Sequence, residues 1–171
     1  SLILFLNIDI YILFNIIFLM SLIIIFFIFY SYIIMFAFNK KLWDIGQKIE
    51  DDTLPILNKF FNANFKRNND IFDILDFHDD NKKIICEVKG RRNRHNQYPT
   101  TIITTKKITE GLMKIDQGYR VFLIFAFTDK TMGIELKEDF NFEVKITGTN
   151  SIEHYLIPVS ELKEIDDNFL N

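Results

Sequence analysis

The chain has 171 residues and a formal net charge of −3, with 49% hydrophobic and 25% charged residues. This length allows one domain with a buried core, and the weakly acidic balance excludes a protein that coats nucleic acid through its overall charge. Any contact with nucleic acid therefore has to rest on a local basic patch. Cys86 is the only cysteine, which excludes an intrachain disulfide, and the cysteine usage gives no indication of an oxidising compartment.

Residues 1–38 are almost wholly apolar, and Asp9 is the only charged residue among them. The stretch of residues 16–38 is longer than the roughly 20 residues that a bilayer-spanning helix needs. Asn39-Lys40-Lys41 follows directly. The positive-inside rule then predicts a cytoplasmic domain that is anchored to a membrane through residues 16–38.

A second interpretation of residues 1–38 stays open, namely that they do not belong to the native protein. The chain begins with Ser1 rather than Met, and AT-rich DNA upstream of a start codon would encode a similar run of Ile, Phe, Leu, Asn and Tyr. Met20 and Met35 are then candidate starts. Under either interpretation the composition changes at residue 39, so we predict a separate domain over residues 39–171.

Residues 41–61 carry apolar side chains at helical spacing and predict one kinked helix or two short helices. Thr53 and Pro55 favour a break in this segment, because proline removes a helical hydrogen bond.

Two apolar stretches, residues 72–77 and 84–91, are joined by a short polar turn and predict a β-hairpin. Glu87 and Lys89 are two residues apart, so on a strand they share one face while their neighbours face a core. Pairing of the two strands would bring Asp73 near Glu87. Two carboxylates and an ammonium group at one point suit a divalent metal ion and a phosphate.

At these residues the sequence resembles the PD-(D/E)xK nuclease superfamily, the fold of many restriction enzymes, Holliday-junction resolvases and phage exonucleases. The matching pattern is Asp73 followed by Glu87-Val88-Lys89 on the next strand and then Gly90-Arg91, although Phe72 stands where the family pattern has Pro. The resemblance covers residues 42–160. It implies an α/β fold with a restriction-endonuclease-like αβββαβ core and a mixed central sheet flanked by helices, here preceded by an apolar N-terminal helix.

The resemblance also implies a Mg²⁺-dependent endonuclease that hydrolyses phosphodiester bonds in DNA, with Mn²⁺ as a substitute metal. Asp73 and Glu87 would hold the metal, and the backbone carbonyl of Val88 would add a ligand. Lys89 would orient or deprotonate the attacking water and stabilise the phosphate. Asp76 is the alternative to Asp73 and ranks second, because a regular strand turns these two side chains to opposite faces.

Two further positions follow from the resemblance. Related nucleases carry a Glu on the first helix, which Glu50 matches, and a Gln or Lys near the second helix, for which Gln97, Lys106 and Lys107 are candidates. We favour Lys106, because a basic residue at a helix start opposes the macrodipole and suggests another role. A solvated surface side chain is the alternative for each of these residues.

Three arginines, Arg91, Arg92 and Arg94, follow the second strand of the hairpin directly. We expect them to bind backbone phosphates of DNA beside the metal site. The alternative is a solvated basic loop.

The rest of the chain predicts a helix from Thr104 or Thr105 to Gly118 and a buried central strand over residues 119–127. The crossover through this helix favours parallel pairing of the central strand. Further strands are predicted over residues 132–136 and 142–146, an edge strand over residues 155–159 and a short final helix over residues 161–165.

Three functions remain open at this point. The first is the nuclease, and the second is a catalytically inactive DNA-binding or membrane-tethered module that keeps the fold. The third is an α/β protein without a nucleic-acid role, in which Glu87 and Lys89 form a salt bridge on an exposed sheet face. A homodimer is expected only by analogy with nucleases of this superfamily.

Overall fold

The computed structural model describes residues 2–68, 75–147 and 151–165, and within the first helix it describes the side chains of residues 15–31 and 40–61. The chain divides into two compact units, Ser1–Ile45 and Gly46–Asn171. The predicted metal ligand Asp73 lies outside the described residues.

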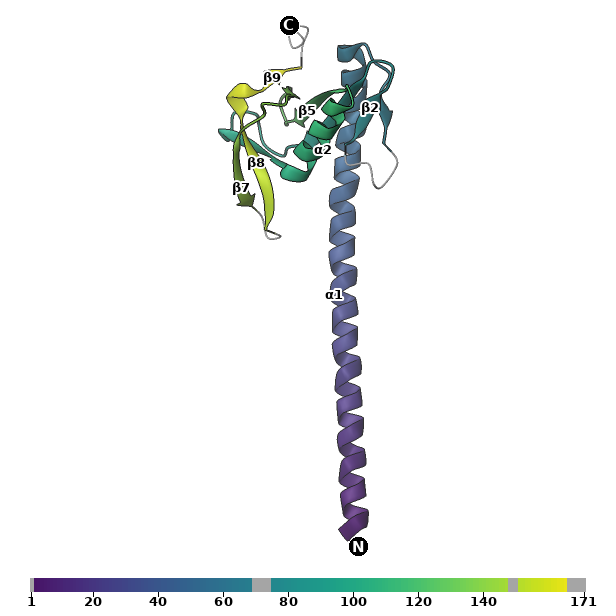
Figure 1. The fold of residues 1–171 in the computed structure, drawn as a ribbon. Coiled ribbons are helices and arrows are strands. Elements are labelled where there is room, and N and C mark those ends of the chain that lie inside the picture. Colours follow the sequence, from purple (N-terminus) through teal and green to yellow (C-terminus); the bar gives the residue numbers. More distant parts are fainter. Residues whose placement is uncertain (1, 69–74, 148–150, 166–171) are drawn as a thin grey trace. The chain divides into compact units, whose positions relative to one another are not determined.

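Helix α1 spans Leu2–Phe61, so the described part of the first unit is helical (Figure 1). The side chains of residues 15–31 are exposed to solvent. Among the described residues, no helix combines the length and the apolar character that a bilayer crossing requires.

Of the two predicted forms of residues 41–61, two short helices are wrong, because α1 continues through Pro55 to Phe61 as one helix. Proline removes only the hydrogen bond to the carbonyl four residues earlier, and tertiary packing can outweigh that loss. Here Leu57 and Phe61 are buried on the sheet, with 0% and 5% of their surface exposed. The hydroxyl of Thr53 donates to the carbonyl of Ile49 at 2.7 Å inside the same helix.

The second unit contains a six-stranded mixed sheet. Its spatial order is β1-β2-β3-β5-β6-β9, in which β3 and β5 are parallel and all other neighbours are antiparallel. The strands are β1 Lys66–Arg67, β2 Phe77–Asp79, β3 Ile84–Gly90, β5 Arg120–Ala126, β6 Thr131–Leu136 and β9 Lys163–Glu164. The predicted α/β class with a mixed sheet is therefore confirmed, and β5 is the predicted central strand.

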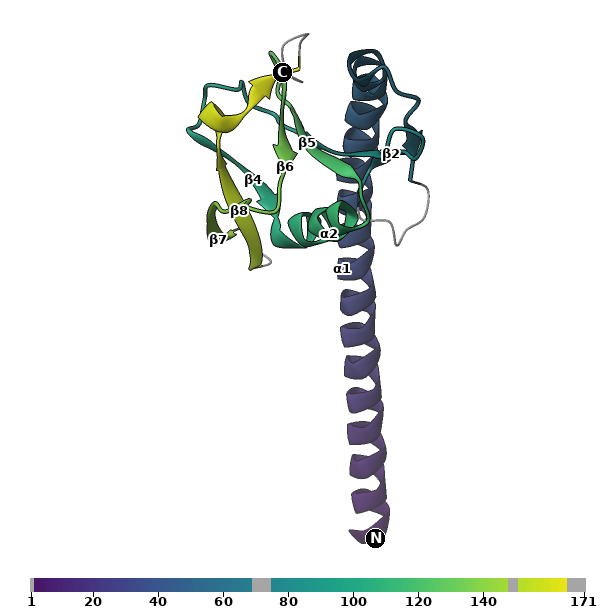
Figure 2. The same cartoon turned by 45° about the horizontal axis from the view of Figure 1, so that its top comes forward.

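A separate three-stranded antiparallel sheet has the order β4-β8-β7, with β4 Thr100–Thr104, β7 Glu143–Thr147 and β8 Ile152–Pro158. Figure 2 shows β4 leading into helix α2, Thr105–Asp116. The predicted edge strand was wrong, because β8 is the middle strand and Pro158 lies only at its end. A 3₁₀ turn, Val159–Glu161, and β9 replace the predicted final helix.

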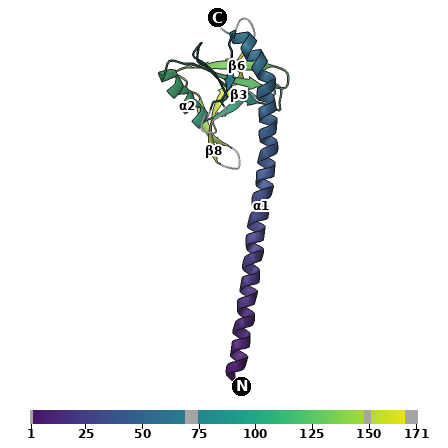
Figure 3. The same ribbon diagram turned by 90° about the vertical axis from the view of Figure 1, so that its right-hand side faces the viewer.

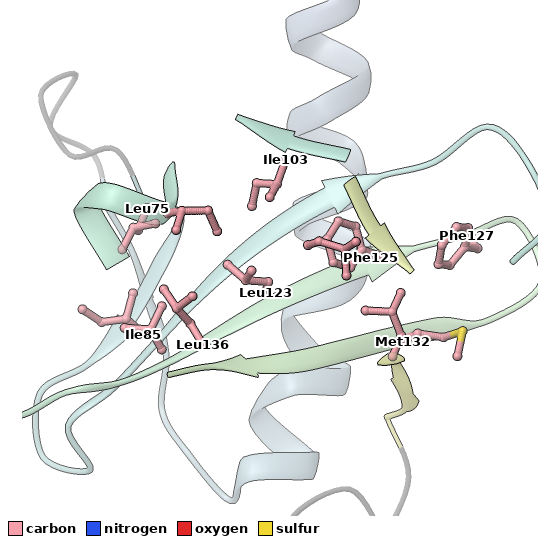
Figure 4. Close-up of a cluster of buried hydrophobic side chains, with 12 residues drawn as sticks. Leu75, Ile85, Ile103, Leu123, Phe125, Phe127, Met132 and Leu136 are labelled. Carbon is pink, nitrogen blue, oxygen red and sulfur yellow. The ribbon is translucent and has the colours of Figure 1, made fainter. Parts of the chain in front are cut away.

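Apolar cores lie on both faces of the large sheet. On one face, Cys86 and Phe122 pack in a cluster with Leu57 from α1. On the other face, Ile85 and Leu123 pack in a cluster with residues from β4, α2 and β8 (Figure 4). Figure 3 shows α2 on one side of strands β3 and β6. Strand β3 is therefore buried on both faces, so any charged side chain on it must be compensated.

The turn between β2 and β3 is organised by Asp79. Its carboxylate accepts hydrogen bonds from the backbone N–H groups of Asn64 at 2.7 Å, Asn81 at 3.0 Å and Lys82 at 3.1 Å. The bond from Asn64 contributes most to holding the pKa of Asp79 below its ordinary value. The predicted hairpin is confirmed by the antiparallel pairing of β2 with β3, although β2 begins only at Phe77.

We expect Leu57→Ala to lower the free energy of unfolding by about 2–5 kcal/mol, because it leaves a cavity under a fully buried side chain. Ile56→Ala is the matched control, since Ile56 is 45% exposed on the same turn of α1. Denaturant unfolding of the full chain, followed by circular dichroism, measures the free energy of unfolding of each variant. Equal losses in the two variants would contradict the packing of α1 on this sheet.

Candidate functional site

Glu87 is a fully buried carboxylate in the middle of β3, with 0% of its surface exposed. Its side chain shares a sheet face with Ile85 and Lys89, because alternate residues of a strand point the same way. The ammonium group of Lys107 donates a hydrogen bond to Oε2 of Glu87 at 2.7 Å, and the Nζ of Lys89 lies 2.7 Å from Oε1. The predicted pair of Glu87 and Lys89 is thus present, but Glu87 is fully buried and Lys89 is only partly exposed, so the pair does not lie on an exposed sheet face.

The two oxygens of Glu87 are not equivalent. Oε2 accepts an aligned hydrogen bond from Lys107, whereas Oε1 is buried without one. The Nζ of Lys89 is close to Oε1 but gives it an ion pair rather than an aligned hydrogen bond. The positive charge of Lys89 therefore compensates Oε1, and the hydrogen bond from Lys107 compensates Oε2.

Asp76, the alternative to Asp73 as a predicted metal ligand, lies in the same cluster as Glu87. Strand β2 begins at Phe77, whose partner is Cys86, so Val88 lies beyond the paired part of β2. The N–H of Val88 donates instead to Oδ2 of Asp76 at 2.7 Å. Asp76 precedes the strand and is not bound by its alternation, so it can reach the cluster, while the first choice, Asp73, lies outside the described residues.

Lys107 draws Asp76 and Glu87 together, since its Nζ lies 3.7 Å from Oδ1 of Asp76 and 2.7 Å from Oε2 of Glu87. Lys106, which the sequence analysis favoured, is exposed on α2 and takes no part in this cluster. A helix turns by about 100° per residue, so neighbouring lysines face different sides. Lys107 lies four residues before the buried Gly111, and this spacing is the sequence signal that favours it.

Glu50, the predicted acidic residue on the first helix, borders this cluster. Its carboxylate accepts a hydrogen bond from Nη1 of Arg67 and one from Nε2 of Gln47 at 3.2 Å. Burial raises the pKa of Glu50, and the charge of Asp76 raises it further. The positive charge of Lys89 opposes this shift. Glu50 is therefore electrostatically coupled to the cluster, while Arg67 holds its carboxylate directly.

Burial and charge shift the protonation of the central pair in defined directions. Burial raises the pKa of Glu87 to about 7, against the opposing charges of Lys89 and Lys107. Burial by itself would lower the pKa of Lys89, but the charges of Glu87 and Asp76 raise it above its ordinary value. Lys89 therefore stays protonated, and Glu87 needs neighbouring positive charge to remain ionised.

The guanidinium group of Arg91 is engaged in contacts within the protein. Its Nε donates to Oγ1 of Thr101 at 2.7 Å, its guanidinium also donates to the carbonyl of Ile102, and the group lies 5.2 Å from the ring centroid of Phe125. Burial lowers the pKa of Arg91 to about 10. Arg91 therefore fastens the end of β3 to β4, and its binding of DNA stays a prediction.

Arg92 and Arg94 remain at the surface, as predicted. Arg92 is exposed, and the side chain of Arg94 is 72% exposed with its Nε 3.4 Å from Oδ2 of Asp129. The backbone N–H and the ring of His95 also bind Asp129, and the backbone bond contributes most to lowering the pKa of Asp129 to about 2. This loop places two arginines next to the end of β3 where Lys89 lies.

Comparison with known proteins adds no relative. No family model, no curated protein and no solved structure matches this chain.

The residues around Glu87 suit a hard divalent cation in their chemistry. Asp76 and Glu87 offer carboxylate oxygens, although the Nζ of Lys89 already lies 2.7 Å from Oε1 of Glu87. The carbonyl of Val88 points to the same side of β3 as its N–H, which is the side of Asp76. Among the described residues, however, no three or more His, Cys, Asp and Glu side chains are grouped so that they could hold a metal ion.

We expect Lys107→Met to destabilise the folded protein by about 1–3 kcal/mol near pH 8, because it removes the hydrogen bond to a buried carboxylate. Lys107 lowers the pKa of Glu87, so its loss raises that pKa further above about 7. The free energies of unfolding of the variant and the wild type therefore differ at pH values where Glu87 is ionised in the wild type. They become equal at about pH 5, where Glu87 is protonated in both proteins.

Lys106→Met is the matched control, because Lys106 is the exposed neighbour on the same helix. Urea unfolding in the presence of a chelator, at both pH values, measures the difference. A cost for Lys107→Met that is equal to that of Lys106→Met, or that does not change with pH, would show that Lys107 does not neutralise Glu87.

Proposed function

We propose that this chain is a Mg²⁺-dependent deoxyribonuclease, and more specifically an endonuclease with a restriction-endonuclease-like fold. The observation that carries the proposal is the cluster of Asp76, Lys89 and Lys107 around the buried carboxylate of Glu87. The element order is α1-β1-β2-β3-β4-α2-β5, and the proposal takes β2, β3 and β4 as the three strands of the expected αβββαβ pattern, with β4 standing in the small sheet.

The cluster contains the groups that phosphodiester hydrolysis requires. A bound Mg²⁺ would activate water and neutralise charge on the phosphate. Asp76, Glu87 and the carbonyl of Val88 are the oxygen donors that would hold the ion. Lys89 and Lys107 keep two ammonium groups beside these donors, and preorganised positive charge stabilises the oxyanion that develops in the transition state.

The cluster is buried at its base and open at its rim. The side chain of Glu87 is 0% exposed and that of Asp76 is 16% exposed, whereas that of Lys89 is 33% exposed. A phosphate can therefore reach Lys89 from solvent, while the carboxylate beneath it is shielded from water. Shielding strengthens the electrostatic interactions on which such a reaction depends.

The loop after β3 supplies a surface for the nucleic-acid backbone. Arg92 and Arg94 are exposed and follow Lys89 by three and five residues. Arginine binds phosphate oxygens through charged hydrogen bonds, and these contacts position a duplex without reading its sequence. The net charge of −3 makes such a local patch necessary.

A second candidate function is a DNA-binding module that does not cleave. The observation that favours it is that ammonium groups lie 2.7 Å from both oxygens of Glu87, so the carboxylate is already neutralised by the protein itself. In this alternative the charges around Glu87 serve folding alone, and only the exposed arginines contact DNA.

We expect the full chain to cleave plasmid DNA in the presence of Mg²⁺ and to lose this activity with a chelator. Lys89→Ala and Glu87→Gln should each reduce the rate by about 100-fold or more, because they remove transition-state charge or an oxygen donor. Lys106→Ala is the matched control and should retain the wild-type rate, since Lys106 is exposed.

Cleavage is followed by the conversion of supercoiled plasmid to nicked and linear forms, after circular dichroism has shown that each variant is folded. Unchanged rates in Lys89→Ala and Glu87→Gln would remove this site from the reaction. Binding of DNA by the wild type without any cleavage would favour the second candidate.

We expect Arg92→Ala combined with Arg94→Ala to weaken DNA binding equally for unrelated sequences. The slope of log affinity against log salt should fall by about 2, since each phosphate contact contributes about 0.9. Arg120→Ala is the matched control, because Arg120 is an exposed arginine that pairs with Glu135. Fluorescence anisotropy in a chelator separates binding from cleavage, and an unchanged slope would contradict a role of this loop.

A further inference from the structure

Strand β7 forms an exposed edge of the three-stranded sheet. The sheet order is β4-β8-β7, so in the described part of the chain only β8 pairs with β7 (Figure 1). An open edge presents unpaired backbone N–H and C=O groups, and proteins normally shorten, cover or charge such strands.

Apolar side chains on β7 are unusually open to solvent for a strand. Val144 is 43% exposed and Ile146 is 67% exposed. Both residues share one face of the sheet, because they are two apart. The apolar surface therefore continues to the very edge of the sheet, where a further strand could cover it.

The charges on β7 are self-complementary. Glu143 and Lys145 share the opposite face, and Nζ of Lys145 lies 3.0 Å from Oε1 of Glu143. If two copies of β7 pair antiparallel with Val144 of each opposite Val144 of the other, Glu143 of each lies opposite Lys145 of the other. The same register places Ile146 opposite Phe142, which precedes the strand.

Other registers are disfavoured by the same charges. A shift of the antiparallel pairing by one residue in each copy places either two Glu143 or two Lys145 side chains opposite each other. Parallel pairing in register does the same. Like charges directly opposite each other destabilise a strand pair. A shift by one residue in only one copy would place Val144 opposite a charged residue. The charges thus disfavour antiparallel pairing centred on residue 143 or 145 and parallel pairing in register, and they favour pairing centred on Val144.

We propose that two copies of this chain associate through their β7 strands in this antiparallel register, forming one continuous sheet across a two-fold axis. An interface of this kind is isologous, since each copy contributes the same strand. The proposal is independent of the nuclease activity, because β7 belongs to the small sheet and the charged cluster surrounds β3.

Cysteine cross-linking tests the register directly. We expect Val144→Cys to give a disulfide-linked dimer on mild thiol oxidation of the full chain, because opposed residues of antiparallel strands have Cα atoms about 4.5–5.5 Å apart. The native Cys86 is buried and does not interfere. Dimers are resolved from monomers by non-reducing gel electrophoresis.

Ile146→Cys is the matched control. Ile146 is more exposed than Val144, so random collisions would cross-link it more readily. In the proposed register, however, the two copies of residue 146 are four residues apart along the pair, about 13 Å, which a disulfide cannot span. Faster cross-linking of Val144→Cys than of Ile146→Cys is the expected result, and the reverse order would overturn the proposal.

Charge exchange provides an independent check in the Val144→Cys background. Lys145→Glu alone should reduce the rate of dimer formation on the order of tenfold, since two opposite-charge pairs become like-charge pairs. Adding Glu143→Lys to the same chain should restore the rate, because every pair is again opposite in charge. Lys137→Glu, a matched change at an exposed lysine, should leave the rate unchanged.

Mixing the two single variants completes the design. Chains with Glu143→Lys and chains with Lys145→Glu should each cross-link poorly alone and well together, and a size tag on one chain identifies the mixed dimer. Association through another surface would leave the rates insensitive to these charges. That outcome, or a double variant that stays as slow as Lys145→Glu alone, would overturn the pairing of β7 with β7.

Discussion

The buried carboxylate of Glu87 is the constraint around which this fold is arranged. Strand β3 has apolar cores on both faces, so an ionised group on it costs free energy unless positive charge lies beside it. Lys89 supplies one ammonium group from the same strand, and Lys107 supplies the other from α2. The start of α2 therefore has to lie against the middle of β3.

Arg91 explains how this placement is achieved. Its guanidinium joins the end of β3 to Thr101 and Ile102 on β4, and β4 runs directly into α2. Fixing β4 in this way positions the first turn of α2, and with it Lys107, above Glu87. Arg91 thus supports the charged cluster through β4 and α2, although it contacts neither Glu87 nor Lys107 in the described contacts.

The small sheet connects two separate features of the molecule. Its strand β4 leads into the helix that neutralises Glu87, and its strand β7 presents the charged and apolar edge for which we propose a second copy as partner. The first feature depends on burial and close ion pairs, whereas the second depends on exposure and on the alternation of charge. The two features can therefore be tested by variants that do not overlap.

The sequence by itself determined the α/β class, the hairpin with Glu87 and Lys89 on one face, and the helix that crosses over to the central strand. These follow from local periodicity and turn chemistry, which need no knowledge of distant residues. Only the tertiary structure decided that Asp76 meets Val88, that Lys107 rather than Lys106 meets Glu87, and that Arg91 is held by β4. Each of these depends on where an element begins and on what packs against it, because a shift of one residue turns a side chain to another face.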